Sequence, residues 1–413
     1  SATQPVHPMT LNILLLEDVH DSATPILNTV PDAHVVRLKH APDASELAAL
    51  LPGIHLLGLR SRTALSRDML AHASSLMAVG AYCTGTNNID LVAASEGGVA
   101  VFNGPFSNTR SVAELVIGHA IELMRRVPER HAAARRGVWL KDSRGSNEVR
   151  GKTLGIVGYG KIGTQVGLLA EAIGMRVMYH DIDARLPLGN ASAAPTLQAL
   201  LGAADVVSLH VPQTERTRLL IDAERLAQMK PGAVFINLAR GHAVDIDALH
   251  AALKSEHLRG AAIDVFPVEP ASNSAEFASP LRELDNVILT PHVGGSTVEA
   301  QRNLGVEVSE KLRDYLLLGA VNGSVNLPAL SVGARRSASR LVHVHRDQPG
   351  VMSQLNRVLA DAGINVSQLH LETDAGMGVA VIDLSVGPNE TTLAALRGAD
   401  GTVTAFLAMA AAP

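Results

Sequence analysis

The chain has 413 residues, of which 47% are hydrophobic, so it is long enough to bury the cores of two or three domains. Its formal net charge of −5 gives no overall attraction to nucleic acid, and Cys83, the only cysteine, excludes an intramolecular disulfide. Residues 1–8 lack a basic region followed by an apolar core, and no apolar run reaches roughly 18 residues. We therefore expect a cytoplasmic protein that binds neither membranes nor nucleic acid.

The first part of the chain alternates between strand-like and helix-like segments. Apolar runs typical of strands lie at residues 12–16, 34–38, 55–59, 76–80 and 99–102. Helical spacing of apolar residues lies between these runs, for example at 45–51 and 67–73. This alternation predicts parallel strands joined by helical crossovers. A single long helix is expected next, at residues 109–136.

A glycine-rich loop occupies the middle of the chain. Residues 157–163 read Val-Gly-Tyr-Gly-Lys-Ile-Gly; they follow an apolar run at Thr153–Val157 and open a segment with helical spacing. A second apolar run, at 175–179, ends just before Asp181. The chain thus has the fingerprint of a dinucleotide-binding unit, which is a strand, a G-x-G-x-x-G loop, a helix, a second strand and an acidic residue in that order.

Each glycine of this loop has a physical role in such a unit. Gly158 permits the tight turn, Gly160 lets the backbone approach a pyrophosphate, and Gly163 lets the helix pack on the strand. A carboxylate at Asp181 can accept hydrogen bonds from the ribose hydroxyls of NAD and would repel a 2′-phosphate. We therefore predict NAD rather than NADP as the cofactor, and no metal.

The alternation resumes after the loop. Apolar runs at 205–211, 233–238, 260–265 and Val287–Leu289 predict further strands, and a second long helix is expected at 297–318. We expect the two long helices to cross between two α/β units, with a cleft between the units.

The composition changes near Leu327-Pro328, where the Ser-, Gly- and Arg-rich residues 331–337 suggest a linker. The tail that follows has the order strand, helix, strand, strand, helix, strand, at 341–345, 351–362, 364–372, 378–386, 391–397 and Thr402–Leu407. This βαββαβ order is that of the ferredoxin-like split unit.

The predicted fold is therefore α/β, with two doubly wound parallel-sheet domains of the Rossmann and flavodoxin types and a ferredoxin-like C-terminal domain. We expect a discontinuous substrate-binding domain (1–107 and 297–330), an NAD-binding domain (108–296) and a tail domain (338–413).

Three side chains each follow a predicted strand of the NAD-binding domain, so they fall at the sheet edge where open α/β folds bind ligands. His292 could accept the proton of a secondary alcohol, and Glu269 would stabilise the protonated imidazole. Arg240 could bind a carboxylate through two parallel hydrogen bonds. Each residue alone also fits a loop contact, a turn or a surface charge, so the hypothesis depends on their occurring together.

These residues resemble, in order, the cofactor loop and Arg–Glu–His triad of the D-2-hydroxyacid dehydrogenase family, over about residues 11–330. Within that family the chain is most similar to the bacterial D-3-phosphoglycerate dehydrogenases, through segments 58–63, 102–114, 136–141 and 290–297. The tail resembles the ACT regulatory domain. The resemblance implies oxidation of D-3-phosphoglycerate by NAD to 3-phosphohydroxypyruvate, the first step of serine biosynthesis.

The resemblance also implies which residues border the two ligands. For the cofactor they are Gly158, Gly160, Lys161, Ile162, Gly163, Asp181, Leu238, Ala239, Asp264, Val293, Gly294 and Gly295. A substrate with a phosphate and a carboxylate needs several cations, and the candidate substrate-binding residues are Arg60, Arg62, Lys141, Lys39 and Asn108. Arg60 and Arg62 also fit a solvated pair at a strand end.

The tail and one exposed loop bear on regulation and assembly. Serine-inhibited relatives bind serine between paired ACT domains through a His and two Asn, whereas this chain has His345, Asp347 and Asn365. We expect an amino-acid site with an altered response to serine. Trp139, the only tryptophan, lies in a basic loop and is either a subunit contact or a packing residue. A homotetramer is expected from dimers through the cofactor unit and paired ACT sheets.

Two alternatives stay open. Another 2-hydroxyacid dehydrogenase, such as a glyoxylate or hydroxypyruvate reductase, would not need Arg60, Arg62 and Lys141 together. A non-enzymatic NAD-sensing regulator on the same fold could retain the whole triad.

Overall fold

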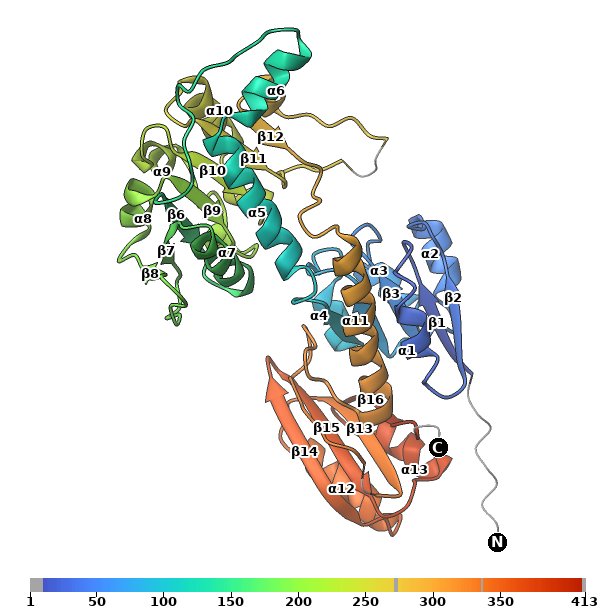
Figure 1. Cartoon of the computed structure of the whole chain (residues 1–413). Coiled ribbons are helices and arrows are strands. Elements are labelled where there is room, and N and C mark those ends of the chain that lie inside the picture. The colour runs from blue at the N-terminus through green and yellow to red at the C-terminus, as the bar shows by residue number, and fades with distance from the viewer. Residues whose placement is uncertain (1–9, 271–273, 336, 411–413) are drawn as a thin grey trace. The chain divides into compact units, whose positions relative to one another are not determined.

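The computed structural model describes residues 10–270, 274–335 and 337–410, which form two compact units (Figure 1). The first unit contains the chain up to Ser107 and from Gln301 onward, and the second spans Asn108–Ala300. Residues 1–8, from which we predicted the lack of an export signal, lie outside the described part. No helix within the described part is long and apolar enough to cross a membrane.

The first unit begins with a five-stranded parallel sheet in the order β2-β1-β3-β4-β5. Its strands are β1 (Leu11–Leu15), β2 (Ala33–Arg37), β3 (Leu56–Leu59), β4 (Ala78–Ala81) and β5 (Ala100–Asn103). The crossovers contain α1 (Ala23–Leu27), α2 (Ala44–Leu50), α3 (Arg67–Ala71) and α4 (Leu91–Glu96). The strands are almost wholly buried apart from β2 at the edge, which is the pattern of a sheet covered on both faces. The predicted strands and parallel sheet are confirmed.

The long helix α11 (Val298–Leu318) packs on this sheet. Val308, Leu312 and Tyr315 from the helix belong to one buried cluster with side chains of β1 and β5. A Cβ atom at Gly80 of β4 would lie 2.8 Å from both Val308 and Leu312, so only glycine allows this close approach. The prediction of a helix at 297–318 is confirmed within one residue.

The tail forms a four-stranded antiparallel sheet in the order β14-β15-β13-β16. Its elements are β13 (Ser339–Arg346), α12 (Val351–Asp361), β14 (Val366–Asp374), β15 (Met377–Leu384), α13 (Glu390–Arg397) and β16 (Thr402–Leu407). The predicted βαββαβ order is confirmed. Side chains such as Leu341 and Ile382 pack with Leu355 of α12 on one face, whereas Val342 and Val381 join the cluster of α11 on the other.

Arg340, which forms a buried ion pair within the tail, also connects the tail to α11. The Arg340 guanidinium donates to both carboxylate oxygens of Asp383, at 2.7 and 3.1 Å, and the two side chains are only 2% and 3% exposed. Arg340 also donates to the carbonyls of Leu318, at the end of α11, and Gly333. The predicted linker, residues 331–337, has no regular structure in its described part, and Arg336 lies outside that part.

The second unit contains a seven-stranded parallel sheet in the order β12-β11-β10-β9-β6-β7-β8. Its strands are β6 (Thr153–Val157), β7 (Arg176–His180), β8 (Ser192–Ala193), β9 (Val206–Leu209), β10 (Val234–Asn237), β11 (Gly260–Ile263) and β12 (Val287–Leu289). Helices α5 (Thr109–Met124) and α7 (Lys161–Ala172) cover one face, and α8 (Leu197–Ala203), α9 (Ala223–Gln228) and α10 (Ile246–Lys254) cover the other (Figure 1).

The prediction of one continuous helix at 109–136 is wrong. Helix α5 ends at Met124, and a separate helix, α6 (Val127–Arg135), follows. Arg126 between them has a left-handed backbone with φ of 56°. Pro128 lies in the first turn of α6, where its missing N–H is tolerated, whereas inside one long helix its ring would clash with the preceding turn.

Candidate active site

Three neighbouring strands of the second unit carry the predicted catalytic residues. Arg240 follows β10, Glu269 follows β11 and His292 follows β12, and these strands are parallel neighbours in the sheet. The carboxyl ends of parallel strands meet at one edge, so the fold brings these distant residues to one edge.

His292 and Glu269 contact each other directly. Nδ1 of His292 lies 2.9 Å from Oε2 of Glu269, and Oε1 of Glu269 accepts the backbone N–H of Phe266. The hydrogen bond to Glu269 raises the pKa of His292 above its ordinary value, although burial opposes this shift. Burial works against ionisation of Glu269, but the contact with His292 and the charge of Arg240 hold its pKa below the usual value. The pair therefore favours an imidazolium beside a carboxylate.

Asp264 anchors the loop that carries His292. Its Oδ1 accepts hydrogen bonds from the hydroxyl of Thr290, at 2.6 Å, and from the N–H of Val293, at 2.8 Å. Its Oδ2 accepts the N–H of Gly294 at 2.9 Å, and the residue is only 1% exposed. Sequence analysis gave Thr290 no role, although a hydroxyl two residues before a candidate base was a usable signal. The loop is fixed tightly enough to hold His292 at a left-handed φ of 54°.

Arg240 is fixed through the backbone at the end of β10. Its carbonyl accepts a hydrogen bond from the Asn237 side chain, which also accepts the N–H of Ala239. Its own guanidinium donates to the carbonyl of Ala239 at 2.7 Å. The side chain is partly exposed at the same sheet edge as His292, where it can meet an anion.

The glycine loop has the geometry that a pyrophosphate-binding turn requires. Gly158 has φ of 92°, and a Cβ atom there would lie 2.5 Å from the carbonyl oxygen of His210. A Cβ at Gly163 would lie 2.2 Å from the Gly158 oxygen, so the helix could not approach the strand with any larger residue. Gly160 precedes α7 and has open space around it, which leaves its backbone accessible. Lys161 and Ile162 form the first turn of α7, whose N–H groups favour anions.

Asp181 follows β7 and already accepts several hydrogen bonds. Its oxygens accept the N–H groups of Tyr159, at 2.8 Å, and Asp183, at 2.9 Å. Burial acts to raise the pKa of Asp181, but these two N–H groups hold it below its usual value. Arg185, whose Nε lies 3.3 Å from the same carboxylate, lowers it further. A carboxylate offers about four acceptor positions, so with these three contacts about one remains for a ribose hydroxyl. Arg185, which sequence analysis missed, partly offsets the charge that would repel a 2′-phosphate.

The other cofactor candidates lie near the catalytic residues along the chain. Leu238 and Ala239 are buried between β10 and Arg240, and Val293 and Gly294 follow His292 directly. Gly295 packs against Asn108 at the start of α5, where a Cβ atom would lie 2.6 Å from the Asn108 amide nitrogen. Asn108 is thus fixed against this loop.

The candidate phosphate-binding cations of the first unit share one sheet edge. Arg60 and Arg62 follow β3, and Lys39 follows β2, so all three lie at the carboxyl ends of parallel strands. Lys39 and Arg62 are exposed and Arg60 is partly exposed. The loop that carries Arg60 and Arg62 is held by Glu17 and Asn88, which sequence analysis missed. For Glu17 the available signal was an acidic residue shortly after the buried strand β1.

Lys141 and Trp139 lie in the second unit, in the loop after α6. The Trp139 side chain is 83% exposed, and its neighbours Val138 and Leu140 are also about half exposed. Such an apolar group in a basic loop is unusual for a surface that contacts only water.

The structure places two of the three predicted effector residues, His345 and Asp347, at the first loop of the tail, where Asp347 donates its N–H to the carbonyl of Gly376. It does not bring Asn365 to them within one domain, because Asn365 contacts Ser385 at the other end of β15. His345 is 3% exposed and stacks on His343, with ring centroids 5.0 Å apart. Burial lowers the pKa of both imidazoles, that of His343 to about 4, so both are neutral at pH 7. Asp347 and Asn365 are exposed, and the charge of Asp347 acts on His345.

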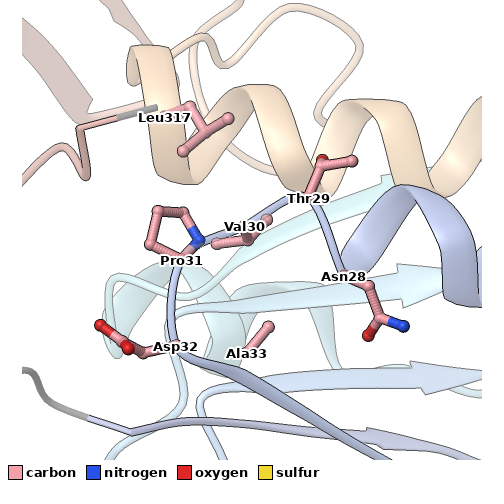
Figure 2. A pocket seen from close by; sticks show the side chains of 7 residues that line it. All are labelled: Asn28, Thr29, Val30, Pro31, Asp32, Ala33 and Leu317. Carbon is pink, nitrogen blue, oxygen red and sulfur yellow. The ribbon is translucent and has the colours of Figure 1, made fainter. Parts of the chain in front are cut away.

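An open pocket of about 760 Å³ in the first unit is lined by none of the predicted site residues. Figure 2 shows it between the loop of residues 28–33 and Leu317 of α11. That loop precedes β2, so it lies at the amino edge of the sheet, opposite Arg60 and Arg62. Asp32 is its only charged lining residue, which does not suit an anionic substrate. No group of His, Cys, Asp or Glu within the described residues could hold a metal ion.

Residues 117–294 match the family model described as the D-isomer specific 2-hydroxyacid dehydrogenase, NAD binding domain. D-3-Phosphoglycerate dehydrogenase of Haemophilus influenzae is 49% identical over 395 residues, 96% of each chain. The chain belongs to the D-isomer specific 2-hydroxyacid dehydrogenase family. D-3-Phosphoglycerate dehydrogenase of Escherichia coli K12 is also 49% identical, over 96% of this chain and 97% of the relative. The family resemblance inferred from the sequence is confirmed.

Two further matches concern the tail and the fold. Residues 341–397 match an AHAS small subunit-like ACT domain, so the chain ends in an ACT domain as predicted. The crystal structure of D-lactate dehydrogenase from Aquifex aeolicus, complexed with NAD and lactic acid, is 26% identical. It superimposes with a TM-score of 0.65 over 74% of this chain and 95% of that one.

Proposed function

We propose that the protein oxidises D-3-phosphoglycerate to 3-phosphohydroxypyruvate with NAD, the first step of serine biosynthesis. The observation that carries the reaction type is the contact between His292 and Glu269 at the carboxyl edge of an NAD-binding sheet. The choice of substrate is supported by relatives of that name that match almost the whole chain, ACT domain included.

His292 would act as the base for the substrate hydroxyl. Its Nδ1 faces Glu269, so Nε2 is the atom that would accept the proton. Glu269 stabilises the imidazolium that forms and fixes the ring orientation. Arg240 would bind the α-carboxylate and polarise the developing carbonyl oxygen. NAD, when bound, supplies the acceptor for the hydride.

The cofactor would be held by the loop that leads into α7. Gly158, Gly160 and Gly163 with Lys161 and Ile162 would bind the pyrophosphate, and Asp181 the ribose. The chemistry of these residues fits a dinucleotide, because the left-handed turn, the accessible backbone at Gly160 and the remaining acceptor position on Asp181 all suit one. Leu238, Ala239, Asp264, Val293, Gly294 and Gly295 would border the nicotinamide.

The substrate phosphate would require cations beyond Arg240. We assign it to Arg60 and Arg62, with Lys39, Lys141 and Asn108 as further substrate-binding residues. In this proposal residues 1–107 and 297–330 form the substrate-binding domain, 108–296 the NAD-binding domain and 338–413 the ACT regulatory domain.

Paired ACT domains would bind an amino acid between them through His345, Asp347 and Asn365. Paired ACT sheets and a dimer contact at Trp139 would assemble a homotetramer. Serine is the effector that the proposed pathway would favour.

NADH formation is the direct test. The purified protein should reduce NAD with D-3-phosphoglycerate and do so much more slowly with lactate or glycerate. Faster reaction with an unphosphorylated acid would identify another 2-hydroxyacid dehydrogenase. No turnover with any of them would favour a non-enzymatic NAD-sensing regulator.

A further inference from the structure

The turn after β1 holds an unusual pair of residues. Glu17 and Asp18 both have left-handed backbones, with φ of 59° and 53°, which costs conformational energy for residues other than glycine. Their N–H groups donate to the carbonyls of His40 and Leu38 after β2, which fixes the turn. This turn directs the Glu17 side chain inward, where it is only 2% exposed, while Asp18 stays exposed.

The buried Glu17 carboxylate binds the backbone of the loop that carries Arg60 and Arg62. Its Oε1 accepts the N–H groups of Arg60, at 3.2 Å, and Thr63, at 2.8 Å. Its Oε2 accepts the N–H of Arg62 at 3.0 Å. These three bonds compensate a buried charge that would otherwise be costly.

Asn88 holds the same loop through its carbonyl groups. The Asn88 amide donates to the carbonyl oxygen of Arg60 at 2.9 Å and to that of Thr63 at 2.7 Å. Glu17 and Asn88 therefore bind the donors and the acceptors of one short loop, from segments far apart in sequence.

The arginine charges are left largely available by this arrangement. Nε of Arg62 lies 3.7 Å from Glu17, so that guanidinium is only partly paired. Within the described residues no carboxylate forms an ion pair with Arg60. The backbone, rather than the two guanidiniums, neutralises most of the carboxylate charge.

We propose that Glu17 is a positioning residue for substrate specificity, which together with Asn88 preorganises the 60–63 loop so that Arg60 and Arg62 bind a phosphate monoester. This inference rests on the proposed function, because it assigns the loop to the substrate phosphate. A loop that is already fixed does not have to become ordered each time a phosphate binds. The gain in affinity should therefore appear only for phosphorylated substrates.

The test compares Glu17→Gln and Asn88→Ala with the matched control Asp18→Asn, which changes the adjacent exposed carboxylate. Glu17→Gln replaces one acceptor oxygen with an NH2 group, which is a donor and cannot accept a hydrogen bond from the loop N–H groups. Either variant should raise KM for D-3-phosphoglycerate by about 10-fold or more, and leave kcat/KM for D-glycerate nearly unchanged. Inhibition of D-glycerate oxidation by inorganic phosphate should weaken in parallel. Asp18→Asn should behave as the parent.

Several outcomes separate the two proposals. A parent enzyme that does not prefer D-3-phosphoglycerate would overturn the proposed function itself. In a second outcome the parent prefers D-3-phosphoglycerate and Arg60→Ala raises KM for that substrate selectively. If Glu17→Gln and Asn88→Ala then affect D-3-phosphoglycerate and D-glycerate equally, the positioning role alone is overturned. Where circular dichroism shows that Glu17→Gln does not fold, Asn88→Ala decides, because it loosens the loop from the other side.

Discussion

Nδ1 of His292 and Oε2 of Glu269 lie 2.9 Å apart, and this contact raises the pKa of the imidazole. In the proposed mechanism oxidation requires neutral His292, so the acid limb of the pH–rate profile should report the raised pKa. Glu269→Gln removes the carboxylate charge, lowers the pKa of His292 and should move the acid limb to lower pH. The measurement is kcat/KM against pH for both proteins, with Glu276→Gln, an exposed carboxylate, as control. Superimposable profiles would show that the pair is not coupled.

His292→Ala tests the base itself. Turnover should fall by about 10²–10⁴-fold, because the variant lacks the proposed acceptor of the hydroxyl proton, while NADH binding stays nearly unchanged. Steady-state kinetics and NADH fluorescence titration measure the two effects separately. Near-normal turnover would remove His292 from the mechanism.

Sequence patterns predicted three strands with no error in their bounds, namely Thr153–Val157, Val287–Leu289 and Thr402–Leu407. The fully buried strands β3, β4 and β5 were predicted one or two residues out of place, because a continuous apolar run does not show where pairing begins and ends. The break between α5 and α6 was missed although Pro128 signalled it, because helical apolar spacing was given more weight.

The candidate site was predictable only in part. Strand ends identify Arg240, Glu269 and His292, because parallel topology places such residues at one edge. The bonds from Glu17 to Arg60, Arg62 and Thr63 join residues more than 40 positions apart, and no local pattern encodes them. The contact of Arg185 with Asp181 is local, but many other partners for that arginine fit the sequence equally well.

Asp181→Ala should weaken NAD binding more than NADP binding. The variant loses a ribose acceptor and the repulsion of a 2′-phosphate, and it leaves Arg185 free of one of its two carboxylate partners. KM should therefore rise for NAD and change little or fall for NADP, measured with saturating D-3-phosphoglycerate. Asp183→Asn, which removes the other partner, serves as the control. Equal use of both cofactors by the parent would contradict the role given to Asp181.

Asp383→Asn should destabilise the tail strongly. It leaves the Arg340 guanidinium, which is 2% exposed, without its charge partner, and unpairing such a buried charge costs about 3–5 kcal/mol. Chemical denaturation should show an earlier transition than in Asp361→Asn, which alters an exposed carboxylate at the end of α12. Identical transitions would mean that solvent or another group compensates Arg340.

The proposed response to serine should depend on the first loop of the tail. Asp347 stands beside the buried, neutral His345, and the family resemblance inferred from the sequence implies Asn at this position in serine-inhibited relatives. An ionised carboxylate accepts but does not donate hydrogen bonds, so it attracts the ammonium of an amino acid and opposes its carboxylate. We expect weak inhibition by serine in the parent and stronger inhibition in Asp347→Asn, measured as the concentration that halves NADH formation. Asp374→Asn, at the end of β14, controls for removal of a charge elsewhere in the domain. Strong inhibition of the parent that Asp347→Asn leaves unchanged would show that this residue does not set the serine response.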